Sequence, residues 1–280
     1  MTFAVTAALV SAMGWRWGFW GPGVVCFLAA LVMYRTIADR PQTYGLPSIG
    51  RYKNEPEPEA AEPIGKYQLQ VIKHPGVWML ALANAFLSVA RYGIGNWGPL
   101  YLQISKAYPG AAAGSVLAVY PVAEILGSVT SGYVSDKLFG AKRNAPALIY
   151  GLLEIASLTA LFMIPPGHRL LDSAALVVYG FALGGLLVYL GGLMAIDLVS
   201  RKAAGAAMGL VGLLTYIVAA VQDTLSGYLI DASKTVVNGA ATYSFQMVFT
   251  VWIGALVLST ICAASLWVFA RLSRSKAESA

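Results

Sequence analysis

The sequence predicts an all-α membrane protein, a polytopic bundle of helices that crosses a lipid bilayer several times. Of its 280 residues 58% are hydrophobic, and the mean hydropathy is +0.67. Only 11% are charged, whereas an average soluble domain has roughly 25%. Because so few charges cannot coat a water-soluble surface of this size, composition argues against a soluble enzyme or a nucleic-acid-binding module.

Eight apolar segments follow one another along the chain, and none alternates in the way a half-buried strand does. Segment 2–13 is too short to span a membrane and turns at Gly14 directly into the next segment. We interpret it as the end of a helix whose beginning is absent. The other seven are long enough to cross the bilayer as helices, and we expect them at about 18–37, 77–102, 112–134, 146–165, 173–199, 203–230 and 244–270.

One long polar connection, residues 38–75, interrupts these segments. Its centre runs Glu55-Pro56-Glu57-Pro58-Glu59, and prolines and like charges keep such a stretch extended. We interpret it as a cytoplasmic linker between two helix bundles. The expected domains are then a remnant of an N-terminal bundle at 1–37, the linker at 38–75, a six-helix C-terminal bundle at 76–271 and a cytoplasmic tail at 272–280.

Basic residues predict the orientation of the chain. If the helices alternate in direction, fourteen lysines and arginines of the connections and the tail fall on one side of the membrane. The other side has Arg16, Lys106, Arg169 and Lys234. Because basic loops stay in the cytoplasm, we expect a plasma (inner) membrane protein with a cytoplasmic C-terminus. The same distribution accounts for the net charge of +6 without nucleic acid, with anionic membrane lipid as a weak partner.

Arg91 is the strongest candidate for a binding residue, because it lies inside an apolar helix. A charge at the centre of a spanning helix costs about 2.5–3.5 kcal/mol on insertion scales and usually faces a watery cavity or a partner. Asn84, Ser88, Arg91 and Gly95 share one helix face. A guanidinium matches phosphate or carboxylate oxygens, so this face predicts an anion site. The alternative is an arginine paired internally with Glu124 or Asp223.

Other polar residues inside the apolar segments have two possible interpretations. Glu124, Glu154, Gln222 and Asp223 are candidate proton or counter-ion sites, or structural partners of a basic or backbone group. Gly180 with Gly184, and Gly205 with Gly209, are spaced for close helix packing or for the sliding that a transporter needs. Two cysteines and two scattered histidines predict no metal site. Nothing predicts a cofactor.

The stretch 132–143, which reads Gly-Tyr-Val-Ser-Asp-Lys-Leu-Phe-Gly-Ala-Lys-Arg, joins two predicted helices on the cytoplasmic side. It resembles the signature loop of the major facilitator superfamily. An acidic residue that meets basic residues at a helix end can hold one conformation closed. The candidate conformational latch consists of Asp136, Lys137, Lys142 and Arg143.

Three further stretches resemble the organophosphate:phosphate antiporters of that superfamily. They are Asp39-Arg40-Pro41-Gln42 with Gly45-Leu46-Pro47, Arg91-Tyr92-Gly93-Ile94 with Asn96-Trp97, and Lys202-Ala203-Ala204-Gly205. The resemblance implies the C-terminal half of a major facilitator fold, preceded by the sixth helix and a stump of the fifth. It also implies that Arg91 binds phosphate at the centre of the protein.

The candidate substrate-binding residues are then Arg91, Asn84, Ser88, Tyr92 and Glu124. The chain departs from the family at three places. Ser88 stands where a tyrosine is common, and Pro121 where a glutamate is usual, with Glu124 one turn later. Gly185-Leu186-Leu187 replaces a Gly-Pro pair in the tenth helix.

The function implied is transport, not enzymatic catalysis. An organic phosphate such as glycerol 3-phosphate or a hexose phosphate would exchange for inorganic phosphate by alternating access. We expect the chain alone not to transport, because it lacks the N-terminal bundle that completes a central pathway. The alternatives are a non-transporting sugar-phosphate sensor that acts on a membrane signalling kinase, and an inactive truncated transporter.

Overall fold

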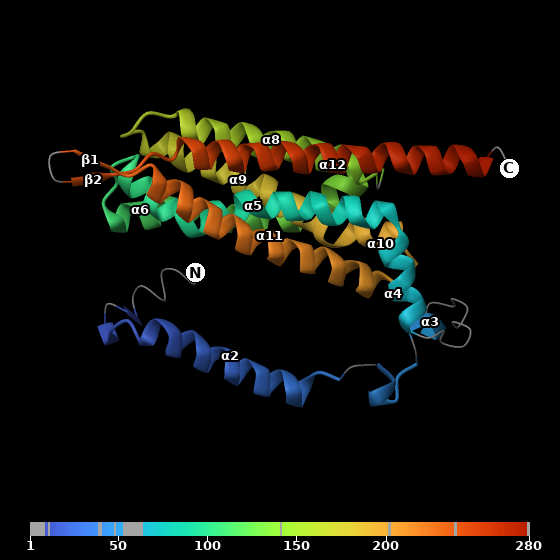
Figure 1. The fold of residues 1–280 in the computed structure, drawn as a ribbon. Coiled ribbons are helices and arrows are strands. Elements are labelled where there is room, and N and C mark those ends of the chain that lie inside the picture. The colour runs from blue at the N-terminus through green and yellow to red at the C-terminus, as the bar shows by residue number, and fades with distance from the viewer. Residues whose placement is uncertain are drawn as a thin grey trace. The chain divides into compact units, whose positions relative to one another are not determined.

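The computed structural model describes residues 9–10, 12–38, 41–47, 49–52, 64–140, 142–200, 203–237 and 240–278. These residues are almost entirely helical (Figure 1). They belong to two compact units, Met1–Pro63 and Ile64–Ala280. Several predictions lie outside the described residues: those for 1–8, Asp39, Arg40, the acidic stretch within 53–63, Lys202 and the last two residues of the tail.

The first unit contains one long helix, α2 (Trp17–Thr36), followed by the short turns η1 (Pro41–Tyr44) and α3 (Ile49–Tyr52). The side chains of α2 are apolar along almost its whole length, and Arg35 lies in its last turn. Most of them are exposed in this unit, as expected for a helix surrounded by lipid. The hydroxyl of Tyr44 donates to the carbonyl of Thr36 at 3.1 Å and so ties η1 to the end of α2.

The second unit is a bundle of long helices. Its elements are α4 (Ile64–Lys73), α5 (Pro75–Ile104), α6 (Gly110–Leu117), α7 (Val119–Tyr133), η2 (Val134–Leu138), α8 (Asn144–Met163), α9 (Arg169–Val188), η3 (Tyr189–Leu193), α10 (Met194–Leu198), α11 (Ala204–Ala232), β1 (Thr235–Val237), β2 (Ala240–Thr242) and α12 (Gln246–Glu278). The strands β1 and β2 form an antiparallel pair. This hairpin and α6 lie at one end of the bundle, and α10 and α4 lie at the other (Figure 1).

Side-by-side packing links the helices into a curved row. Helix α5 packs against α11 and α12, α12 packs against α8, α8 against α9, and α9 against α7. Trp252 of α12 is fully buried, and its indole N–H donates to the hydroxyl of Ser226 on α11 at 3.1 Å. A Cβ on Gly93 of α5 would lie 2.4 Å from the Trp252 ring. Three helices therefore meet around this indole, two residues beyond Arg91.

The predicted fold class is confirmed. Within the described residues, seven helices are long and apolar enough to cross a membrane, and they correspond to the seven spans expected from the sequence. Two spans are less regular than expected. Ala118 interrupts the span predicted at 112–134, and Pro121, which has no N–H to donate, lies in the first turn of α7. The span predicted at 173–199 contains the wide π-helical turn η3 before α10.

Two small elements were not predicted. Residues 64–73, placed in the linker by the sequence, form the amphipathic helix α4, whose Val71 is buried. The connection between α11 and α12 contains the β1–β2 hairpin, in which Thr235 and Thr242 face each other with their hydroxyls 2.7 Å apart. Both elements lie outside the spanning helices.

Candidate functional site

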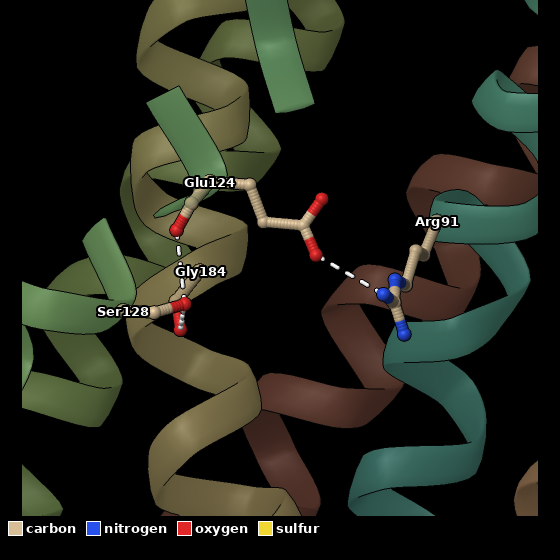
Figure 2. Close-up of polar contacts among 4 residues, drawn as sticks. All are labelled: Arg91, Glu124, Ser128 and Gly184. Carbon is tan, nitrogen blue, oxygen red and sulfur yellow. Dashed lines mark hydrogen bonds and ion pairs between the residues drawn. The ribbon is translucent and has the colours of Figure 1, made fainter. Parts of the chain in front are cut away.

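The polar centre of the second unit is an ion pair between Arg91 of α5 and Glu124 of α7. The Nη2 of Arg91 donates to Oε1 of Glu124 at 3.1 Å, as Figure 2 shows. The two side chains reach toward each other from helices that each pack on other partners. The pairing predicted as the internal alternative for Arg91 is therefore present, and Glu124 rather than Asp223 is the partner.

This contact leaves most of the guanidinium free. Arg91 has five N–H donors, and Glu124 is its one hydrogen-bond partner within the described part of the chain. The side chain of Arg91 is 36% exposed and that of Glu124 is 19% exposed. The guanidinium also lies 5.7 Å from the ring centre of Tyr92, within cation–π range. The arrangement can therefore accept a bidentate anion without first breaking up a closed network of donors.

Asn84 and Ser88 lie on the same helix face but are buried. The amide nitrogen of Asn84 donates to the hydroxyl of Thr215 on α11 at 2.7 Å. The hydroxyl of Ser88 donates to the carbonyl of Asn84 at 2.8 Å, and Ser88 is 0% exposed. In this conformation Asn84 ties α5 to α11, Ser88 is bonded within α5, and only the Arg91 end of the predicted polar stripe is accessible.

Close backbone contact fixes the position of Glu124. Ser128, one turn later on α7, donates both to the Glu124 carbonyl at 2.9 Å and to the Gly184 carbonyl of α9 at 3.1 Å (Figure 2). A Cβ on Gly184 would lie 2.0 Å from the Glu124 carbonyl oxygen, and a Cβ on Gly180 would lie 2.2 Å from that of Tyr120. The Gly180–Gly184 spacing therefore permits a helix contact that any larger residue would prevent.

The remaining intramembrane polar candidates have separate surroundings. Asp223 accepts from the indole of Trp97 at 2.9 Å and from Asn96 at 3.2 Å, both on α5. Gln222 donates to Ser226 at 2.9 Å within α11. Glu154 of α8 is 0% exposed, and neither of its carboxyl oxygens has a hydrogen-bond partner among the described residues.

The four predicted latch residues lie at the η2 end of α7. Asp136, Lys137 and Lys142 are exposed there. Arg143 pairs with Asp197 of α10 at 2.5 Å, and it donates to the Leu193 carbonyl at 2.7 Å. Asp197 was not among the residues predicted for this latch.

A buried cluster of three residues at the opposite end was missed. Lys106 and Asp172 form an ion pair of 3.0 Å with side chains 2% and 0% exposed, and Lys106 also donates to the Ile164 carbonyl. The hydroxyl of Tyr108 donates to Asp172 at 2.6 Å. Burial, together with this hydrogen bond, raises the pKa of Tyr108 to about 12. Between the two donors, Ala107 has a φ of +58°, unusual for a residue with a Cβ. The only available signal was an Asp early in an apolar segment.

Metal chemistry finds no support in the described residues, among which no three His, Cys, Asp or Glu side chains gather. The accessible guanidinium of Arg91 is a group that can bind phosphate or carboxylate oxygens.

Comparison with known proteins gives a consistent result. The family model described as Major Facilitator Superfamily matches residues 1–222. The glycerol-3-phosphate transporter of Haemophilus influenzae is 28% identical over 270 residues, which cover 88% of this chain and 54% of that protein. The glycerol-3-phosphate transporter of Bacillus subtilis is 29% identical over 81% of this chain and 53% of its own length.

A third relative is named for a different role. The membrane sensor protein UhpC of Salmonella typhimurium is 29% identical over 80% of this chain and 51% of its own length. The chain thus spans about half the length of the curated relatives it matches. The resemblance to organophosphate:phosphate antiporters drawn from the sequence is confirmed by these relatives.

Proposed function

The chain belongs to the Major Facilitator Superfamily, and from that premise we propose that it takes part in exchanging an organic phosphate ester for inorganic phosphate. Glycerol 3-phosphate and hexose phosphates are the substrate classes suggested by the names of the relatives. The six spanning helices of the second unit would act as the C-terminal bundle. A second bundle would complete the pathway.

The observation that carries the proposal is the accessible guanidinium of Arg91. It lies within a spanning helix, is 36% exposed and gives one N–H to Glu124. A phosphate group can accept two parallel N–H bonds from such a planar donor. Glu124, and Tyr92 beside the guanidinium, would orient it. Asn84 would contribute through its hydrogen bond to Thr215 of α11, and Ser88 through its hydrogen bond to the Asn84 carbonyl.

Alternating access follows from the same geometry. Two bundles rock around a central site, so that the site opens first to one side of the membrane and then to the other. The latch residues Asp136, Lys137, Lys142 and Arg143 lie at one end of the bundle, where they would hold one of these states closed. Nothing in this cycle requires covalent chemistry, and no cofactor enters it. The positive charge of the connections supports a plasma (inner) membrane protein with its C-terminus in the cytoplasm.

Equilibrium binding tests the proposal directly. We expect the purified full chain in detergent to bind radiolabelled glycerol 3-phosphate and inorganic phosphate at one shared site. Arg91→Lys keeps the positive charge and loses the planar, forked set of N–H donors. It should weaken the binding of both ligands at least about tenfold, which is 1.4 kcal/mol. Asp223→Asn, which changes an acid away from Arg91, is the matched control. Equal affinity in Arg91→Lys and the unaltered chain would refute the phosphate role of Arg91.

A sensor is the second candidate function, supported by the similarity to UhpC. It would keep the Arg91 site and act on a membrane signalling kinase instead of moving solute. Phosphate-loaded liposomes that contain the chain together with an N-terminal bundle distinguish the two. Rapid exchange of external labelled glycerol 3-phosphate supports transport, whereas tight binding without exchange supports sensing. Absence of exchange together with absence of binding would favour an inactive truncated product.

A further inference from the structure

Glu154 is a carboxyl group that neither the packing nor the proposed function explains. It lies in the middle of α8 and is 0% exposed, and both of its carboxyl oxygens lack a hydrogen-bond partner among the described residues. Asp172 shows the contrast, because it is equally buried but pairs with Lys106 at 3.0 Å. A carboxylate without a cation or donor is strongly disfavoured in a low dielectric, so Glu154 is neutral in this conformation, with a proton on one oxygen.

Polar and charged groups on neighbouring helices act on Glu154. From α9, Tyr179 interacts electrostatically with Glu154, and its own hydroxyl is buried and unpartnered within the described residues. From α7, the charge of Glu124 acts on Glu154. From α12, which also packs on α8, the side chains described for 246–266 include no acidic or basic residue. On α8 itself, Tyr150 lies one turn away.

Tyr179 lies on α9, which packs against both α7 and α8. It interacts electrostatically with Glu124 and Arg91 as well as with Glu154. Its ring also stands edge-on to that of Tyr120 on α7 at 6.1 Å. A carboxyl group that has no cation of its own, within electrostatic reach of Glu124, would respond to the charge of an anion bound at Arg91.

We propose that Glu154 is a proton-binding site coupled to anion binding at Arg91. With Glu154 protonated, the charges of Arg91 and Glu124 sum to zero. Loss of the proton from Glu154 adds a second negative charge beside that of Glu124, and the net negative charge repels an anion. The proton passes between bulk water and a Glu154 oxygen, and no other bond changes.

Coupling of this kind is reciprocal. If a proton on Glu154 strengthens anion binding, a bound anion strengthens proton binding by the same factor. This inference rests on the proposed function, because it needs an anion at Arg91, and it adds a second ligand, the proton.

The test is the pH dependence of glycerol 3-phosphate binding to the full chain between about pH 7.5 and 9.5, above the second pKa of a phosphate ester, near 6. We expect the affinity to fall by up to about tenfold per pH unit, the slope for one linked proton. Glu154→Gln, a neutral isostere of the protonated acid, should bind as tightly at pH 7.5 and lose this slope. Asp223→Asn should keep it. Thermal melting verifies that each variant is folded.

The outcomes separate the inference from the proposed function. If the ester binds through Arg91 but Glu154→Gln keeps the slope, or the unaltered chain has none, the proton site is refuted and the phosphate site stands. If no ester binds at any pH, the proposed function fails and the coupling fails with it. Infrared difference spectra of the unaltered chain against Glu154→Gln, without any anion, provide an independent readout. They should show the carbonyl stretch of a protonated carboxylic acid, and its absence at pH 7.5 would also refute the proposal.

Discussion

Arg91 and Glu124, 33 residues apart in the sequence, are joined by one hydrogen bond of 3.1 Å between α5 and α7. A bidentate pair would have used two N–H donors and both carboxylate oxygens. The single contact instead holds the guanidinium in place while most of its donors stay available. Glu124 is therefore the counter-ion of Arg91, and in the proposed function an incoming anion would compete with it.

Removing the charge of Glu124 should strengthen anion binding. Glu124→Gln keeps the size of the side chain and an oxygen that can accept from Arg91, and it removes a negative charge next to the bound phosphate. A favourable change of about 1 kcal/mol, typical of a partly exposed charge pair, corresponds to roughly fivefold tighter binding. The measurement is the affinity for labelled glycerol 3-phosphate at neutral pH. Weaker binding would show instead that the Glu124 carboxylate contacts the substrate.

The glycines between α7 and α9 should be intolerant of a methyl group. In Gly184→Ala the new Cβ would lie 2.0 Å from the Glu124 carbonyl oxygen, so the two helices must separate. We expect a loss of about 1–3 kcal/mol of stability, seen as a lower melting temperature in detergent. Gly209→Ala on α11 is the control, because its Cβ meets no atom within 4 Å, and helix propensity makes it neutral or stabilising. Equal melting of the two variants would contradict the close contact.

Replacing one partner of the buried Lys106–Asp172 ion pair should destabilise the protein more than replacing both. Lys106→Met leaves Asp172 with the hydroxyl of Tyr108 alone, and removing one partner of a buried ion pair typically costs about 3–5 kcal/mol. The double variant Lys106→Met with Asp172→Leu should recover part of that loss, because it leaves no unpaired charge. Melting temperatures of the two single variants and the double variant form the cycle. Additive losses would show that the two residues do not interact.

Alkaline pH should remove the contribution of Tyr108. Its pKa of about 12 lies above the ordinary value of 10.0, so the folded protein retains the phenolic proton more strongly than the unfolded chain. The resulting stability is fully present below about pH 10 and is lost as the pH rises through about 12. Tyr108→Phe should therefore melt below the unaltered chain at pH 8, and the gap should narrow toward pH 12. A gap that stays constant with pH would be inconsistent with the hydrogen bond to Asp172.

The spanning helices could be predicted because each is a local property of the sequence. A run of about twenty apolar residues must satisfy its own backbone in lipid, so the positions of α2, α5 and α8 follow from composition alone. The exception was the break at Ala118, where a turn separates α6 from α7. Arg91 was also predictable as a special residue, because its charge is conspicuous in an apolar segment.

Contacts between helices could not be predicted from the sequence in the same way. Helical spacing placed Ser88 on the face of Arg91, but only the packing of the neighbouring helices decides that Ser88 is 0% exposed. Arg143 and Asp197 are 54 positions apart, and Lys106 and Asp172 are separated by intervening spans. Pairing across such separations depends on how helices are arranged in three dimensions. Glu154 was equally ambiguous until its burial without a partner was known.

The wide turn η3 puts a surplus residue into the long helix that runs from Arg169 to Leu198. Each residue turns a helix by about 100°, so the side chains before Tyr189 and after Leu193 are rotated against each other relative to an unbroken helix. Arg143 donates a hydrogen bond to the carbonyl of Leu193, the last residue of this turn. Moving the extra residue along the helix would rotate the end that carries Leu193 and break this hydrogen bond, so the winding of one helix would determine which partner Arg143 holds.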